Sequence, residues 1–168
     1  MEETPEDFRR LQGLLDESIE RAGDFLRSSF EMPELSLSAG ELVEALYGSL
    51  TVAFSTTTAK GEPRVAPVGT LFYRGRFHVP TVADSARARH ARKRPSVSLT
   101  YYRSNDLAVI AHGRAEPLYR DHPDFDELDA LEREHVGESV LDWGEGVYLR
   151  VEAAVLYTFA RHLKEART

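Results

Sequence analysis

The fold is decided by residues 48–82, which read GSLTVAFSTTTAKGEPRVAPVGTLFYRGRFHVPTV. Apolar and polar side chains alternate from Leu50 onward, which is the period of a strand with one buried face. The pairs Lys60-Gly61 and Arg74-Gly75 interrupt the alternation, and such pairs are typical of hairpin turns. The segment therefore predicts a three-stranded antiparallel meander, with strands near 49–56, 64–73 and 76–81.

The chain after this meander predicts two helices and three more strands. Residues 85–93 are rich in alanine and arginine and predict a short helix, and residues 121–136 carry apolar side chains at helical spacing. Strands are expected near 97–101, 107–117 and 147–159, and in the last one the odd-numbered residues are expected to share one face. Six strands with local connections favour a mostly β fold, an antiparallel β-barrel with α-helical additions.

The first 47 residues have a helical pattern. Apolar residues recur every three or four positions from Phe8 to Phe30, which predicts one amphipathic helix that ends at Met32-Pro33. Ser38 is a suitable N-cap for a second, shorter helix that ends at Gly48. We expect a single domain overall, in which residues 1–47 are a helical extension and residues 48–168 form the barrel.

Composition excludes several classes of protein. The chain has 168 residues, of which 42% are hydrophobic and 29% charged, as in a soluble single domain. It has no cysteine, which excludes disulfides, thiolate-bound metals and thiol nucleophiles. No apolar run approaches the roughly 20 residues of a membrane span, and the first residues are acidic. We therefore expect a cytoplasmic protein without a membrane partner.

The net charge of −7 is unevenly distributed along the chain. Residues 1–47 contribute −8, residues 48–104 contribute +8 and residues 105–168 contribute −7. A basic middle third between acidic ends favours a local site for a small anion, because the acidic surroundings repel a long phosphate backbone. A small phosphorylated ligand is therefore a better candidate than a nucleic acid.

Local signatures of the common enzyme classes are missing from the sequence. It contains no Gly-x-Gly-x-x-Gly, no phosphate-binding loop that ends in Gly-Lys-Ser/Thr, no Gly-x-Ser-x-Gly and no His-Glu-x-x-His. The six histidines are scattered along the chain, so no metal site is expected. The chemistry of this protein is therefore not carried by a familiar catalytic motif.

The run from Ser85 to Arg94 is the densest positive feature. A short helix that follows a strand end presents free backbone N–H groups and the positive end of its dipole. The hydroxyls of Thr81 and Ser85, with the forked guanidinium of Arg87, would complete a phosphate site there. The alternatives are a solvent-exposed basic helix face without a ligand and a nucleic-acid patch.

The same residues belong to a longer ordered pattern that spans about residues 42–117. It comprises Gly61-x-Pro63-Arg64-Val65-Ala66-Pro67-Val68, a turn at Gly75, Phe77-His78-Val79-Pro80-Thr81, Ser85-x-Arg87-x-x-His90 and Pro95-x-Val97-x-Leu99. This order resembles the pyridoxamine 5′-phosphate oxidase-like split β-barrel flavoproteins. The resemblance implies a six-stranded split β-barrel and a homodimer, with FMN or a deazaflavin in a groove at the dimer interface.

The resemblance also implies roles for individual residues. Thr81, Ser85 and Arg87 correspond to the phosphate binders, and His90 stands where many relatives have asparagine. Residues Arg64, Val65, Ala66, Pro67 and Val68 correspond to the ledge on which the isoalloxazine ring lies. The arginine- and histidine-rich C-terminal motif of the true oxidase is not evident near residues 157–162, so oxidation of vitamin B6 is not expected.

We expect an FMN-binding oxidoreductase that acts on a small organic substrate, because the flavin itself supplies the hydride chemistry and no catalytic side chain is assigned. One alternative is the deazaflavin coenzyme F-420, whose anionic tail would suit Arg92, Lys93 and Arg94. Another is a carrier or sensor without turnover that holds flavin or haem, with His78, His90 and His112 as candidate iron ligands. A structural dimer with no cofactor is the simplest alternative.

Overall fold

A computed structural model describes residues 3–161 of the chain. Its strands are β1 (Ser49–Thr57), β2 (Pro63–Tyr73), β3 (Arg76–Val82), β4 (Ser96–Arg103), β5 (Leu107–Leu118) and β6 (Gly146–Ala160). Its helices are α1 (Pro5–Arg21), α2 (Asp24–Ser29), α3 (Ala39–Ala45), α4 (Ala86–Lys93), α5 (Phe125–Val136) and the 3-10 helix η1 (Val140–Trp143).

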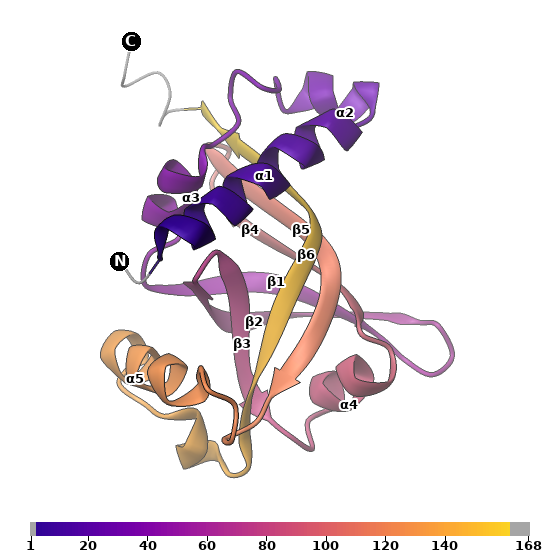
Figure 1. Cartoon of the computed structure of the whole chain (residues 1–168). Helices are drawn as coiled ribbons and strands as arrows, with labels where there is room; N and C mark the ends of the chain where they lie inside the picture. The colour runs from indigo at the N-terminus through magenta and orange to yellow at the C-terminus, as the bar shows by residue number, and fades with distance from the viewer. Residues whose placement is uncertain (1–2, 162–168) are drawn as a thin grey trace.

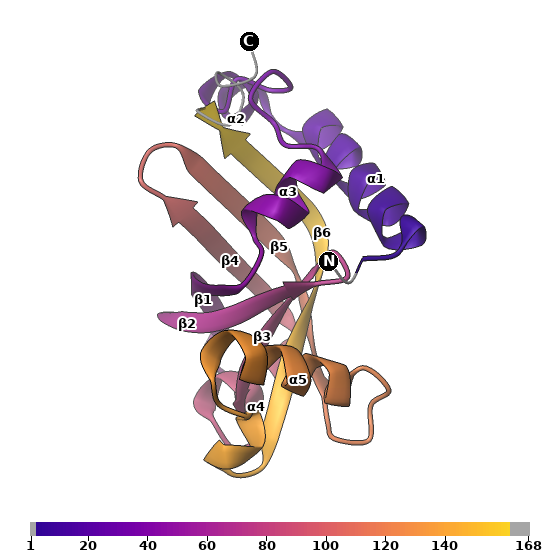
Figure 2. The same ribbon diagram turned by 90° about the vertical axis from the view of Figure 1, so that its left-hand side faces the viewer.

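The six strands form one closed antiparallel barrel in the order β1-β2-β3-β6-β5-β4 (Figure 1). α1 and α3 lie toward one end of the barrel, and α4 and α5 lie toward the other (Figures 1 and 2). This arrangement confirms the predicted six-stranded, mostly β fold with helical additions. Within residues 3–161, no helix is long and apolar enough to cross a membrane.

The meander has the turns that its sequence predicts. Gly61 and Gly75 adopt φ angles of +80° and +68°, a region that glycine occupies without the steric cost of a Cβ atom. The turn at Gly61 pairs β1 with β2 so that Val52 lies opposite Val68. Both valines are buried inside the barrel, so the even-numbered residues of these two strands form its inner face.

α1 and α3 close one end of the barrel with leucine side chains. Leu11 and Leu15 of α1 and Leu42 and Leu46 of α3 are buried in the same apolar cluster as Val151 of β6. Full burial of such a side chain stabilises the fold by about 1.5–3 kcal/mol. The two helices therefore share the core of the barrel, and each begins at a capping box.

The prediction of one continuous N-terminal helix up to Phe30 is wrong. α1 ends at Arg21, and a separate helix begins after Gly23, a residue with low helix propensity. The Arg27 guanidinium donates a 2.7 Å hydrogen bond to the carbonyl oxygen of Ile19, which at the end of α1 also accepts a 3.2 Å hydrogen bond from the backbone N–H of Ala22. This contact stabilises the break between the two helices.

The prediction that odd-numbered residues share one face along the whole last strand is also wrong. The register of β5 against β6 shifts between His112 and Gly113, where Ala154 is an extra residue in β6. One extra residue in a strand reverses the faces of those that follow. Leu156 is consequently buried on the same inner face as Val147 and Val151, although its even-numbered position predicted the opposite face.

α5 and η1 cover the outer side of the barrel with a second apolar cluster. α5 begins at Phe125, later than the predicted start at Asp121, and η1 was not predicted. The fully or nearly fully buried members of this cluster are Tyr73, Leu118, Phe125, Leu128, Val140 and Tyr148.

Two neighbouring carboxyl groups are buried on α5. Burial disfavours ionisation of Asp129, but hydrogen bonds from Ser139 and Arg133 outweigh that effect and lower its pKa. Glu132 is 3% exposed, and burial together with the negative charge of Asp129 raises its pKa to about 7. The two carboxyl groups therefore differ in charge near neutral pH, because hydrogen bonds stabilise the charged form of Asp129 and burial destabilises that of Glu132.

Gly113→Ala is expected to lower the free energy of unfolding by about 1–3 kcal/mol, because a Cβ atom at this bulge would lie 2.0 Å from the carbonyl oxygen of Glu152. Urea unfolding followed by circular dichroism measures the change. Gly13→Ala is the control, since a Cβ there meets nothing within 4 Å and alanine favours a helix. Equal stability of Gly113→Ala and the wild type would contradict the bulge geometry.

Glu132→Gln is expected to raise the free energy of unfolding at pH 8 by about 1–3 kcal/mol and to change it little at pH 4. The unfolded glutamate loses its proton near pH 4.5, whereas the folded one keeps it up to about pH 7. Wild-type stability is therefore lost as the pH rises through that window, and the amide removes this loss. Chemical denaturation at several pH values, with exposed Glu134→Gln as the control, tests the expectation; parallel pH profiles would refute it.

Candidate functional site

A groove of about 400 Å³ lies where the ends of β1 and β2 meet α4. It has an apolar floor, three hydroxyl or imidazole groups and two guanidinium groups. Its lining residues are Phe54, Thr56, Thr58, Arg64, Val65, Ala66, Ala86, Arg87 and His90. This composition suits a ligand with a flat apolar part and an anionic end.

Ser85 and Thr81 lie beside the N-terminus of α4. Ser85 is the N-cap, and its Oγ accepts hydrogen bonds from the backbone N–H of Ala88 at 3.2 Å and from the hydroxyl of Thr81 at 3.0 Å. Both bonds use lone pairs of Ser85, so its hydroxyl hydrogen is still free to be donated. No described residue accepts it. Neither residue is part of the groove lining, but Ser85 precedes Arg87 by two residues at the helix terminus, and Thr81 reaches Ser85 from the end of β3.

Arg87 is the cation of the groove that remains available to a ligand. Arg64 forms an ion pair with Glu62 at 2.8 Å, and Arg94 donates a 2.8 Å hydrogen bond to the carbonyl oxygen of Thr57. Arg87 has neither an ion pair nor a side-chain hydrogen bond with any other residue that the structure describes. A half-buried guanidinium without a partner is suited to bind an anion.

Only part of the segment predicted as a ring ledge lies at the groove. Arg64, Val65 and Ala66 line the groove. Val68 is 5% exposed and belongs to the barrel core, whereas Pro67 lies on the outer face and is exposed. The structure therefore brings the first three of these residues to the groove and places the other two elsewhere.

Sequence reasoning missed the residues that β1 contributes to the groove. Phe54 and Thr56 are inward-facing and lie opposite Ala66 and Arg64 in the register of the hairpin. Thr56 is 4% exposed, and its Oγ1 lies 3.0 Å from Nδ1 of His90. The turn at Gly61 sets the pairing of β1 with β2, and the strand alternation sets the inner face. Together these two signals could have placed Phe54 and Thr56 beside Ala66 and Arg64.

On the outer side of five strands, three rows of residues contain no Asp, Glu, Lys or Arg; the next row, Ser96, Arg114 and Glu152, is charged, and Phe159 at the other edge packs against Phe30. The paired registers define the three rows across this sheet face. The rows are Pro67, Ala53, Thr100, Ile110 and Tyr157; Val65, Ser55, Ser98, His112 and Val155; and Tyr102, Ala108 and Phe159. A face of a sheet that meets only water is normally polar, and depletion of charge is typical of the core of a protein interface.

Two of these residues define how the face relates to the site. Val65 is 69% exposed and belongs both to the face and to the groove lining, so the groove opens at an edge of this face. His112 is exposed, and its Nδ1 lies 2.7 Å from the Ser98 hydroxyl. It is the one histidine in the three rows.

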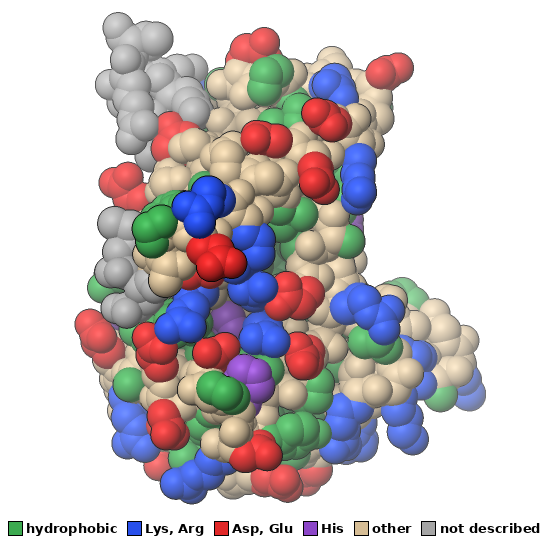
Figure 3. Space-filling view, in the orientation of Figure 1, with side chains coloured by type: hydrophobic (Ala, Val, Ile, Leu, Met, Phe, Trp, Pro, Cys, Tyr) green, Lys and Arg blue, Asp and Glu red, His purple; other side chains and the backbone are tan. Residues whose placement is uncertain are grey.

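Positive side chains gather near the groove. Figure 3 shows Lys and Arg side chains over α4 and the β1–β2 hairpin, at the lower right of the view. Arg89, Arg92 and Lys93 of α4 are exposed. This surface gives a negative ligand an attractive approach to the groove.

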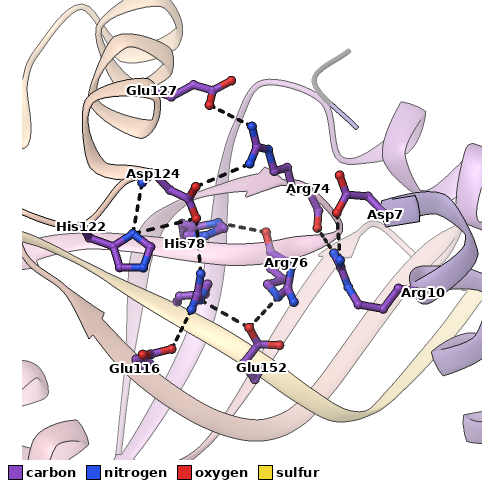
Figure 4. A network of polar contacts seen from close by, with 11 residues as sticks. Asp7, Arg10, Arg74, Arg76, His78, Glu116, His122, Asp124, Glu127 and Glu152 are labelled. Carbon is purple, nitrogen blue, oxygen red and sulfur yellow. Dashed lines mark hydrogen bonds and ion pairs between the residues drawn. The ribbon is translucent and has the colours of Figure 1, made fainter. Parts of the chain in front are cut away.

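His78 lies apart from the groove, beneath a network of ion pairs (Figure 4). It is 1% exposed, and its Nδ1 lies 3.2 Å from the carbonyl oxygen of Arg76. Burial and the positive charge of Arg150 lower the pKa of His78 to about 3. Arg150 itself pairs with Glu116 at 2.8 Å and with Asp124 at 3.4 Å. His78 is therefore a neutral packing residue, and its position gives an iron atom no access from solvent.

The three histidines considered as haem ligands lie in three different places: the groove, the sheet face and the buried network. Among residues 3–161, no group of three or more His, Asp or Glu side chains is arranged to hold a metal ion.

Comparisons with solved structures find the same fold in proteins of low sequence identity. The chain is similar to an FAD-binding protein from Mesorhizobium loti (19% identity, TM-score 0.58, covering 73% of this chain and 93% of that one). It is similar to the heme storage protein from Vibrio cholerae (18% identity, TM-score 0.62, 74% and 96%). It is also similar to an F-420 reductase (15% identity, TM-score 0.56, 68% and 94%).

A comparison with curated protein sequences finds no match. The family model described as pyridoxamine 5′-phosphate oxidase matches residues 39–156. The match begins at α3, includes all of the groove and ends within β6. The chain belongs to the pyridoxamine 5′-phosphate oxidase family of split β-barrel proteins.

Proposed function

We propose that this protein is an FMN-dependent oxidoreductase that binds the cofactor in the groove between β1, β2 and α4. The observation that carries the proposal is the unpaired guanidinium of Arg87 beside the Ser85 cap, at the end of a groove with an apolar floor. Both groups have hydrogen-bond donors that no described residue uses, and a terminal phosphate needs such donors.

Each part of the groove has a role in this proposal. The Ser85 hydroxyl, Arg87 and the N-terminus of α4 hold the phosphate, with Thr81 orienting Ser85 through its hydrogen bond. Arg64, Val65 and Ala66 support the ring system along β2, and Phe54 excludes water beneath it. Pro67 and Val68 act indirectly, because they fix the course of the strand. The bound flavin would supply hydride transfer to or from a small organic substrate.

The proposal includes a homodimer formed through the open sheet face. The three rows carry apolar, hydroxyl and aromatic side chains with one histidine and no Asp, Glu, Lys or Arg, and the groove opens at the edge of the face through Val65. A second copy on this face would bury Ile110 and Tyr157 and would form one wall of the groove. This arrangement places the cofactor at the interface of two protomers.

A deazaflavin, coenzyme F-420, is the second candidate cofactor. The observation that favours it is the surplus of exposed cations beyond the groove, Arg89, Arg92 and Lys93, which would suit a longer anionic tail than that of FMN. One of the similar structures is an F-420 reductase. Titration of the apo protein with both cofactors decides between them.

The first experiment is an absorption spectrum of the purified protein, with mass spectrometry of any compound released by acid. A flavin spectrum with stoichiometric release of FMN would support the proposal. Turnover with a reduced nicotinamide and an electron acceptor then distinguishes an enzyme from a flavin carrier. A protein that takes up neither FMN, the deazaflavin nor haem would refute the oxidoreductase proposal.

Arg87→Ala is expected to weaken FMN binding about tenfold to hundredfold, the loss of a hydrogen bond to a charged group worth about 1.5–3 kcal/mol. Fluorescence titration of the apo protein measures the dissociation constant. Arg9→Ala, which removes an exposed arginine of α1, is the control for net charge. Unchanged affinity of Arg87→Ala would remove Arg87 from the phosphate site.

Ile110→Glu is expected to convert a dimer into a monomer, because a buried carboxylate at the centre of the face would have no partner charge. Analytical ultracentrifugation measures the mass, and circular dichroism checks that the barrel is folded. Val136→Glu, on exposed α5 surface away from the face, should leave the dimer intact. A wild-type protein that sediments as a monomer would contradict the proposed interface.

A further inference from the structure

The groove contains a hydrogen bond that the proposed phosphate site does not use. His90 lies one turn after Arg87 on α4, so the two side chains share the helix face that lines the groove. Thr56 reaches His90 from the inner row of β1, with its Oγ1 3.0 Å from the imidazole Nδ1. Thr56 is 4% exposed, so its hydroxyl has almost no access to water.

The direction of this hydrogen bond follows from the number of hydrogens available. A hydroxyl has one hydrogen and two lone pairs. If Nδ1 of His90 donated to Thr56, the hydroxyl hydrogen of Thr56 would need another acceptor, and none exists among the residues that the structure describes. A buried donor without an acceptor costs about 1–3 kcal/mol. The favourable arrangement is therefore the one in which Thr56 donates and Nδ1 accepts.

This direction determines which nitrogen of His90 carries the hydrogen. In the neutral ring Nδ1 is bare, so the hydrogen is on Nε2, at the distal edge of the imidazole. In the charged ring both nitrogens carry hydrogens, and Nδ1 donates to the Thr56 hydroxyl instead. Nε2 is consequently a donor in both states of protonation.

We infer that Thr56 is a positioning residue that holds His90 as a permanent Nε2–H donor, and that this donor serves the anionic group of the ligand beside Arg87. The second half of the inference rests on the proposed function. The charged groups near the ring are Arg87 of α4, Arg94 just after α4, whose guanidinium donates to the Thr57 carbonyl, and Arg64 of β2, paired with Glu62. With no unpaired carboxylate among these groups, the groove selects anions, and protonation of His90 strengthens that selection.

The tautomer is tested directly in the apo protein by ¹⁵N NMR of the histidine side chains, with His90→Asn assigning the signals. At pH 8 the wild type is expected to show a protonated Nε2 and a bare Nδ1 at His90. Thr56→Val, which has nearly the same shape without the hydroxyl, is expected to show a mixture of the two tautomers. A wild-type ring protonated at Nδ1, or an unchanged tautomer in Thr56→Val, would overturn the inference.

The consequence for the ligand is tested by FMN titrations at two pH values. At pH 8, Thr56→Val is expected to raise the dissociation constant about threefold to tenfold, and Thr56→Ser, which keeps the hydroxyl, is expected to restore wild-type affinity. The defect should disappear at a pH low enough for the NMR spectrum to show both nitrogens protonated. An equal loss at both pH values would indicate a structural defect and overturn the positioning role.

Two controls separate the possible failures. Thr51→Val makes the same substitution on the exposed side of β1 and should leave FMN affinity unchanged at both pH values. If the wild type binds neither FMN nor inorganic phosphate, the proposed function and the ligand half of the inference fail together. The NMR experiment still decides the Thr56–His90 tautomer in that case, because it needs no ligand.

Discussion

The barrel closes between β1 and β4 through only three residue pairs, Ala53 with Thr100, Phe54 with Leu99 and Ser55 with Ser98. This short seam is the constraint on which the site depends. Beyond Ser55 the end of β1 is no longer paired with β4, and α4 lies there instead. The hydrogen bond from Arg94 to the carbonyl oxygen of Thr57 satisfies part of the exposed strand edge. The groove lies here because α4, and not a strand, is the neighbour of this end of β1. A helix packs against a strand at a larger distance than a hydrogen-bonded strand does, and this leaves space between them.

The position of α4 in the chain follows from the same constraint. The helix connects β3 to β4, strands that are not neighbours in the barrel, so the connection must cross the barrel end. β3 ends at Val82, and Ser85 caps the helix three residues later, so the free N–H groups and the positive dipole end of α4 lie beside Arg87 at the groove. The connection through α4 thus both links β3 to β4 and supplies the positive charge of the site.

The two outer sides of the barrel differ in whether helices cover them. One side carries Tyr73, Tyr148 and Leu118, and α5 with η1 covers these side chains. The other side carries Ile110, Tyr157 and Val65 with no helix over them. The uncharged face at the edge of the groove is the surface on which we propose that a second copy docks, whereas the covered side holds the buried carboxyls of α5 and the ion pairs around His78.

The strands, the turns at Gly61 and Gly75, the barrel class and the basic run of α4 could be predicted from the sequence, because alternation, turn chemistry and charge are local properties. The sequence also identified Arg64, Ala66 and Arg87, all of which line the groove. Three features could not be predicted: the positions of Pro67 and Val68 outside the groove, the contact between Thr56 and His90, and the reversal of the faces of β6 at Ala154. Each of these depends on the register between distant strands or on packing across the barrel. The sequence of one segment does not specify such a contact, because the contact contributes free energy only when both segments are folded against each other.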